Sequence, residues 1–164
     1  MIKNVNQISE QAFLLDFGNE ITKEINQNVL NTFYYISKNM QKDNFLGLKN
    51  CVPSYNKLLI HFDPSKKNKE DLINFINSIE FSQVRSKKNV EELEIPVCYD
   101  EEFALDIQNV SKKTKIDEDA IIKSHLSTKF FVYMIGFMPG LPFMGDLESN
   151  LNVSRLNTPR LRVP

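Results

Sequence analysis

Residues 48–64, Leu-Lys-Asn-Cys-Val-Pro-Ser-Tyr-Asn-Lys-Leu-Leu-Ile-His-Phe-Asp-Pro, contain two short apolar runs. The runs 48–55 and 57–62 each have the length and composition of a strand. Pro53 has no backbone donor, so it restricts the first strand to an edge or a bulge of a sheet. The dipeptide at 63–64 ends the second strand. This stretch therefore predicts two short strands in succession.

Helical patterns lie on both sides of these strands. Apolar side chains recur every three or four positions over residues 21–40, and residues 72–79 repeat that spacing. Further strands are predicted over 12–17 and 81–85. The resulting order β-α-β-β-α-β predicts an α+β fold with a small ferredoxin-like domain over residues 1–88.

The charge distribution divides the chain near residues 86–89. Residues 1–90 carry 12 basic and 9 acidic groups, whereas residues 91–148 carry 5 basic and 12 acidic groups. The polar, basic stretch 86–89 is typical of a linker, so we place a second domain at 89–164. The whole chain has a formal charge of −1. It lacks the basic excess needed to bind nucleic acid by bulk charge, and we expect no nucleic-acid partner.

The composition favours a globular cytoplasmic protein. Apolar residues make up 41% and charged residues 25% of the chain, close to the globular average. No apolar run is long enough to span a membrane, and the N-terminus lacks the apolar core of a signal peptide. Cys51 and Cys98 form neither a disulfide framework nor a metal quartet, and two scattered histidines add no metal ligand set. We expect no membrane association and no metal.

The second half begins with alternating apolar residues that predict a strand over 93–99. Helices are predicted around 103–110 and 117–125. This pair superficially fits a DNA-binding helix-turn-helix, but the second helix begins with three carboxylates, which phosphate would repel. Residues 129–135 are apolar nearly throughout and predict a strand buried on both faces.

The loop 136–145, Gly-Phe-Met-Pro-Gly-Leu-Pro-Phe-Met-Gly, holds three of the five glycines and two of the seven prolines of the chain. Glycine permits positive φ and close backbone approach, and proline stiffens the loop. The phosphate-binding patterns GxxxxGK[ST] and GxGxxG are absent. The residues leave two interpretations open: the loop lines a pocket or partner surface, or it is a tight turn inside a β-barrel core.

Arginine and histidine supply the candidate charged groups. Three of the four arginines, Arg155, Arg160 and Arg162, lie in the last ten residues of a chain that otherwise uses lysine. A planar guanidinium binds carboxylates in a way that lysine does not, although a solvated basic tail is the alternative. His125 lies at a predicted helix end, where a cationic ring is favoured, and a structural role is its alternative. His61 alternates within an apolar strand and is expected to be structural.

The segment 133–147, Tyr-Met-Ile-Gly-Phe-Met-Pro-Gly-Leu-Pro-Phe-Met-Gly-Asp-Leu, with Arg155 and residues 158–164, resembles a family signature. The family comprises allophanate hydrolase subunit 1, the kinase inhibitor KipI and the B subunit of bacterial 5-oxoprolinase, and corresponds to carboxyltransferase subdomain C and D. The resemblance extends over essentially the whole chain through residues 17–21, 52–64 and 95–103. Asp146 stands where the family usually has a glycine.

The resemblance implies a ferredoxin-like domain over 1–88 and a cyclophilin-like β-barrel over 89–164. Family members continue with further glycine-rich strands, so we expect an incomplete barrel and an isolated chain without activity. The implied function is that of a hydrolase subunit, foremost of 5-oxoprolinase, which opens 5-oxoproline to glutamate with ATP. The implied partners are allophanate hydrolase subunit 2, or a protein like the C subunit of 5-oxoprolinase, and a LamB/YcsF-type subunit. The alternatives are a KipI-like inhibitor of a sensor histidine kinase, or an inactive fragment.

The family's pocket lies in the barrel, and the resemblance carries its positions to this sequence. Arg155 or Arg160 would clamp a carboxylate or carboxyphosphate-like group in a bidentate manner. His125 would carry a proton or orient the substrate by a hydrogen bond. The positions expected to bind substrate are Tyr133, Gly136, Phe137, Pro139, Gly140 and Pro159.

Overall fold

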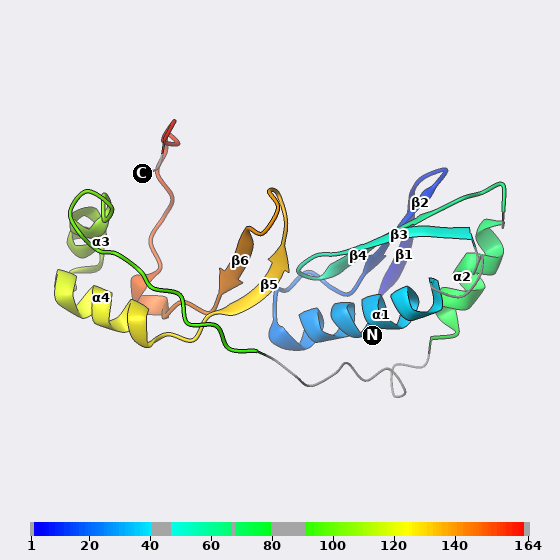
Figure 1. The fold of residues 1–164 in the computed structure, drawn as a ribbon, viewed down its shortest axis with the longest axis horizontal. Coiled ribbons are helices and arrows are strands. Elements are labelled where there is room, and N and C mark those ends of the chain that lie inside the picture. Colours follow the sequence, from blue (N-terminus) through cyan, green and yellow to red (C-terminus); the bar gives the residue numbers. More distant parts are fainter. Residues whose placement is uncertain (1, 41–46, 67, 80–90, 163–164) are drawn as a thin grey trace. The chain divides into compact units, whose positions relative to one another are not determined.

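A computed structural model describes residues 2–40, 47–66, 68–79 and 91–162 (Figure 1). The chain divides into two compact units. The first comprises Met1–Asn89 with Val132–Phe143, and the second comprises Val90–Phe131 with Met144–Pro164. Strand pairs and helices alternate along the chain, and the strands of the larger sheet pair antiparallel, which confirms the predicted α+β class.

The first unit contains a four-stranded antiparallel sheet in the order β1-β2-β4-β3. Its strands are β1 (Asn4–Ser9), β2 (Ala12–Asp16), β3 (Leu48–Pro53) and β4 (Lys57–Phe62). The two central strands pair in a continuous register that runs from Ala12 opposite His61 to Asp16 opposite Lys57. Three predicted strands are thereby confirmed, and β3 is the edge strand that Pro53 requires.

The strand β1 has no counterpart in the sequence prediction. Its sequence, Asn-Val-Asn-Gln-Ile-Ser, has no apolar run, and most of its side chains are exposed. An edge strand can be this polar because one long side of it faces solvent. The strand predicted over 81–85 lies outside the described residues.

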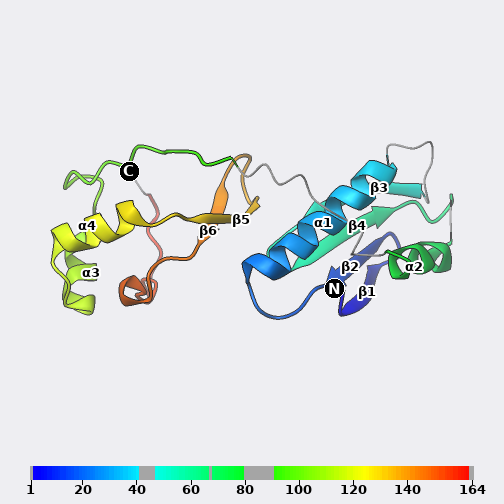
Figure 2. The same ribbon diagram turned by 90° about the horizontal axis from the view of Figure 1, so that it is seen from below.

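Two helices pack against this sheet (Figure 2). They are α1 (Lys23–Met40) and α2 (Lys69–Asn77), and both predicted helices are confirmed. The hydroxyl of Thr22 accepts a hydrogen bond from the Ile25 N–H at 3.2 Å. The Asn68 side chain likewise accepts one from the Asp71 N–H at 2.9 Å. Each helix therefore begins where a polar side chain satisfies a free backbone donor.

The core of the first unit lies between the sheet and both helices. Side chains alternate along a strand, so every second residue of β2 and β4 faces the helices. The rings of Phe13 and Phe62 stack there, with centroids 5.4 Å apart. The fully buried members of this cluster are Phe13, Leu15, Leu58, Ile60 and Phe62 from the sheet, Val29 and Ile36 from α1, and Leu72 and Ile76 from α2.

The second unit contains two helices and a short 3-10 turn. They are α3 (Ile107–Thr114), α4 (Glu118–Ser127) and η2 (Ser149–Leu151). The first helix begins at Ile107, later than predicted, because residues 101–103 form a turn. Between the helices, Lys115 takes a left-handed φ of 62° and ends α3. None of the helices described here is long and apolar enough to cross a membrane.

The strand predicted over 93–99 is wrong. These residues have no regular secondary structure, and Leu93, Ile95 and Val97 are all at least 50% exposed. The alternation of apolar and polar residues indicates which side chains would face each side of a sheet. A strand also needs a neighbouring strand that pairs with its backbone donors and acceptors. In the described part of the chain, no strand pairs with this segment.

The prediction for 129–135 is only partly right. A strand is present as β5 (Phe131–Ile135), and it forms a two-stranded sheet with β6 (Pro142–Gly145). It is not buried on both faces: on one face Tyr133 is 7% exposed and Ile135 is 64% exposed, and on the opposite face Val132 is 42% exposed. A two-stranded sheet provides too little surface to cover both faces.

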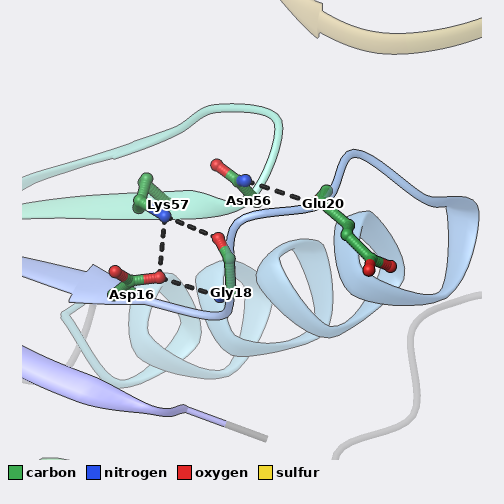
Figure 3. Close-up of polar contacts among 5 residues, drawn as sticks. All are labelled: Asp16, Gly18, Glu20, Asn56 and Lys57. Atoms are coloured by element: carbon green, nitrogen blue, oxygen red, sulfur yellow. Dashed lines mark hydrogen bonds and ion pairs between the residues drawn. The ribbon is translucent and has the colours of Figure 1, made fainter.

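An ion pair joins the ends of β2 and β4 (Figure 3). The Lys57 ammonium donates to Asp16 Oδ1 and to the Gly18 carbonyl, each at 2.7 Å. The Gly18 N–H donates to the same carboxylate oxygen at 2.8 Å, and Asn56 donates to the Glu20 carbonyl at 3.2 Å. The bond from Lys57 is the main cause that lowers the pKa of Asp16. These contacts hold the chain where it leaves the sheet toward α1.

We expect the substitution Asp16→Asn to lower the free energy of unfolding at pH 7 by about 1 kcal/mol, the upper end of what an ion pair close to the surface contributes. The folded-state pKa lies below the unfolded value of 3.8. The carboxylate therefore stabilises the fold above that pH, and its contribution is lost as the pH falls through the folded-state pKa. Urea denaturation of both proteins from pH 7 to pH 2 measures this difference. A difference that stays constant over that range would contradict the assignment.

Candidate functional site

The nine predicted site residues are divided between the two units. The first unit holds Tyr133, Gly136, Phe137, Pro139 and Gly140, and the second holds His125, Arg155, Pro159 and Arg160. The five residues of the first unit lie on and beside one turn, whereas in the second unit His125 and Arg160 have separate partners.

The first group lies on the tight turn between β5 and β6. The Gly136 N–H donates to the Leu141 carbonyl at 3.1 Å, and the Met138 N–H donates back to the Gly136 carbonyl at 2.8 Å. Gly140 has a φ of 82°, a conformation that glycine adopts without strain. The loop is therefore a tight turn, as one of the two interpretations from the sequence expected. Its side chains Phe137, Met138 and Leu141 are exposed and do not lie inside a barrel core.

Two residues near this turn are strained because they have positive φ without being glycine. Phe137 has a φ of 66° and a side chain that is 90% exposed. Asp146 has a φ of 74°. A left-handed conformation costs an L-residue roughly 1–2 kcal/mol. Such strain is often retained at functional sites, which makes Phe137 a candidate for contact with a ligand or partner.

A buried amide attaches the strand β5 to α1. Asn26 is fully buried, and its Nδ2 donates to the carbonyls of Tyr55 at 2.9 Å and Tyr133 at 2.8 Å, with Ser54 O at 3.4 Å. The ring of Tyr55 also meets the ring of Phe143 edge-on, with centroids 5.9 Å apart. The position of Tyr133 is therefore set through its backbone.

The candidate His125 lies in the last turn of α4. Its Nδ1 is hydrogen-bonded to the Tyr99 hydroxyl, and its ring contacts the ring of Phe130 with centroids 5.0 Å apart. His125 and Tyr99 are both half-buried. Burial raises the pKa of the Tyr99 phenol above its ordinary value of 10.0, so the hydroxyl keeps its proton at neutral pH.

The candidate Arg160 is bound to a carboxylate of its own chain. Its Nη1 and Nη2 donate to Asp106 Oδ2 and Oδ1, each at 2.6 Å, in a bidentate arrangement. This bond is the main cause that lowers the pKa of Asp106 and raises that of Arg160. Arg155 and Pro159 are exposed on the same segment.

The two thiols of the chain have different environments. Cys51 in β3 is buried, and burial raises its pKa to about 12. Cys98 is exposed beside Tyr99. Over the described ranges, no group of three or more His, Cys, Asp or Glu side chains is arranged to hold a metal ion.

Sequence reasoning missed three residues that position the candidates. Asn26 gave a weak signal, because it stands among the apolar residues on the buried side of a predicted helix. Tyr99 lies inside the family-like segment 95–103, but nothing in that segment names its partner. Asp106 is one of many acidic residues in this half, so the sequence gives no reason to select it.

The family model described as carboxyltransferase domain, subdomain C and D, matches residues 3–164. The chain belongs to this family. It is 30% identical to the 5-oxoprolinase B subunit of Bacillus subtilis over 98% of this chain and 70% of that protein. It is 42% identical to the 5-oxoprolinase B subunit of Haemophilus influenzae over 44% of this chain and 34% of that protein.

Solved structures of other proteins are also similar to this chain of the carboxyltransferase subdomain C and D family. The crystal structure of TTHA0988 matches 94% of this chain with a TM-score of 0.76 and 29% identity. The match covers 29% of that protein, so this chain spans less than a third of its length. The urea amidolyase of K. lactis matches 84% of this chain and 10% of its own with a TM-score of 0.54. At 17% identity, that likeness concerns the fold alone.

We expect Asn26→Ala to lower the free energy of unfolding by about 2–3 kcal/mol, because it removes the buried amide that donates to the carbonyls of Tyr55 and Tyr133. The matched control is Gln27→Ala, since Gln27 is half-buried and bonds to Asn31 within the same helix. The control should cost less than about 1 kcal/mol. Chemical denaturation compares the two variants, and equal losses would contradict the special role of Asn26.

Relief of strain at Phe137 should be measurable. We expect Phe137→Gly to raise the free energy of unfolding by about 0.5–1 kcal/mol, because glycine adopts positive φ freely and regains part of the roughly 1–2 kcal/mol strain. Phe137→Ala keeps the strain and removes a side chain that is already exposed, so it should leave stability unchanged. Thermal denaturation distinguishes them, and equal stabilities of the two variants would refute the strain.

Proposed function

We propose that this chain is a subunit of an ATP-dependent hydrolase complex that opens the lactam ring of 5-oxoproline to give glutamate. The observation that carries the proposal is the 30% identity over 98% of the chain to a protein named as the B subunit of 5-oxoprolinase. Two further relatives carry the same name at 42% and 35% identity over 44% of the chain.

We assign the substrate carboxylate to the arginines near the end of the described chain. The pairing of Arg160 with Asp106 supports this role, because both guanidinium nitrogens already bind a carboxylate with the required geometry. A substrate carboxylate would exchange with that of Asp106. Arg155, exposed on the same segment, is the second candidate for the clamp.

The other candidates have proposed roles around the lactam. His125 carries a proton or donates a hydrogen bond to the substrate. The remaining positions would shape the substrate pocket: Tyr133, Gly136, Phe137, Pro139, Gly140 and Pro159. The strained backbone of Phe137 and the hydrogen-bonded carbonyl of Tyr133 support a binding surface at this turn.

ATP and the partner proteins belong to the assembled complex in this proposal. The sequence contains neither of the phosphate-binding patterns GxxxxGK[ST] and GxGxxG. We assign ATP to the complex with a LamB/YcsF-type subunit and a protein that resembles allophanate hydrolase subunit 2 or the C subunit of 5-oxoprolinase. A place in the cytoplasm, where ATP is available, is part of the same proposal.

The domain assignment is proposed on the same basis. The antiparallel order β1-β2-β4-β3 with two helices packed on one face supports a ferredoxin-like domain over 1–88. We assign 89–164 to a cyclophilin-like β-barrel on the family resemblance. The hairpin β5–β6 would be part of its wall.

The proposed function is tested with the assembled complex. We expect co-production of this chain with its partner proteins to give ATP hydrolysis that depends on 5-oxoproline, and omission of any one component to abolish it. An assembled complex without that activity would refute the proposal. If the chain instead suppressed autophosphorylation of a sensor histidine kinase, the inhibitor function would replace it.

The arginine clamp has its own test. We expect Arg160→Lys to raise the KM for 5-oxoproline at least tenfold, equivalent to about 1.4 kcal/mol, because lysine keeps the charge and loses the bidentate fork. Arg162→Lys is the matched control, two residues along the same stretch, and should leave KM unchanged. Steady-state kinetics of the complex measures both. An unchanged KM in Arg160→Lys would mean that positive charge alone is sufficient, and it would refute the bidentate arginine clamp.

A further inference from the structure

We propose that Tyr99 is a positioning residue that makes neutral His125 a hydrogen-bond donor through Nε2 rather than a base. The Tyr99 hydroxyl donates to His125 Nδ1 and so fixes the ring proton on Nε2. The further step, in which the Nε2 proton is donated to a substrate oxygen, rests on the proposed function. The position of the proton on the His125 ring does not depend on the proposed function.

The direction of the Tyr99–His125 bond follows from the chemistry of its two groups. A phenol is a more acidic donor than a neutral imidazole N–H, and an imidazole nitrogen is a stronger base than a phenol oxygen. The phenol therefore donates and Nδ1 accepts. A neutral imidazole has one proton, so the proton must be on Nε2 when Nδ1 is the acceptor.

The surroundings hold both partners in this arrangement. His125 is fixed by its helix and by the ring of Phe130, with centroids 5.0 Å apart. Tyr99 directly precedes a turn in which the Asp100 carbonyl accepts bonds from the N–H groups of Phe103 at 2.8 Å and Ala104 at 2.9 Å. This turn fixes the backbone directly after Tyr99. The segment 95–103 therefore places the Tyr99 hydroxyl in contact with His125.

The fixed proton decides what His125 can do to a ligand. A ring with Nε2 protonated and Nδ1 occupied has no free lone pair with which to take a proton. It can donate a hydrogen bond, and such a donor stabilises negative charge that develops on a carbonyl oxygen. The ligand it fits is therefore a molecule with an acceptor oxygen, such as the carbonyl of an amide or lactam. Of the two roles proposed for His125, the geometry selects the orienting donor.

The ring state is measured directly by NMR of the chain with 15N-labelled histidine at pH 8.5, well above the ordinary histidine pKa of about 6.5. The chain has two histidines, so His61 in β4 is an internal control. In the unsubstituted protein, we expect the His125 Nε2 to carry the proton and Nδ1 to show the shift of a hydrogen-bonded acceptor. Protonated Nδ1 would overturn the proposal, and no substitution is needed for this result.

The substitution Tyr99→Phe then removes the hydroxyl and keeps the ring. We expect the His125 Nδ1 resonance to move toward that of an acceptor without a donor, with His61 unchanged. In the assembled complex, we expect kcat to fall about tenfold with KM unaltered, as is typical when a group that orients a site residue is removed. Unchanged His125 resonances or an unchanged kcat would overturn the proposal. A complex that lacks activity before substitution refutes the proposed function and leaves the NMR result to decide the ring state.

Discussion

The amide of Asn26 is the constraint on which the arrangement of the first unit depends. A single side chain of α1 supplies donors to the β3–β4 turn and to β5, so it ties together three segments far apart in the sequence. Its Oδ1 finds no hydrogen-bond partner among the described residues, which costs free energy in a buried site. The hydrogen bonds that its Nδ2 donates offset this cost and set the position of β5 against α1. An apolar residue of similar size would fill the space and would leave the position of β5 unspecified.

The parts of the fold that could be predicted are those governed by local periodicity. The helices α1 and α2 show apolar residues at helical spacing, and the strands β2, β3 and β4 are short apolar runs, so each signal is contained in the element itself. The segment 93–99 alternates apolar and polar residues and forms no strand, because strand pairing depends on a neighbouring segment that the pattern does not identify. The polar strand β1 is the opposite case, in which pairing succeeds without an apolar pattern.

The candidate site was harder to predict because its contacts are long-range. Tyr99 and His125 are 26 residues apart, and Asp106 and Arg160 are 54 apart. Sequence periodicity does not predict contacts between residues so far apart in the chain. The family resemblance therefore identified His125 and Arg160 but not the residues that bind them. Both partners come from one short stretch, residues 99–106, at the start of the acidic part of the chain. That stretch therefore supplies the partners of both candidates, His125 and Arg160.

The unequal burial of the two cysteines has a practical consequence. With a pKa of about 12, the buried Cys51 has almost no thiolate at neutral pH, and a maleimide reagent meets it only when the sheet opens. The exposed Cys98 is accessible in the folded chain. A fluorophore or spin label can therefore be attached at one defined place without engineering, one residue away from the tyrosine that contacts His125. The native sequence thus provides its own attachment point for following how this region responds when partner proteins and substrate are added.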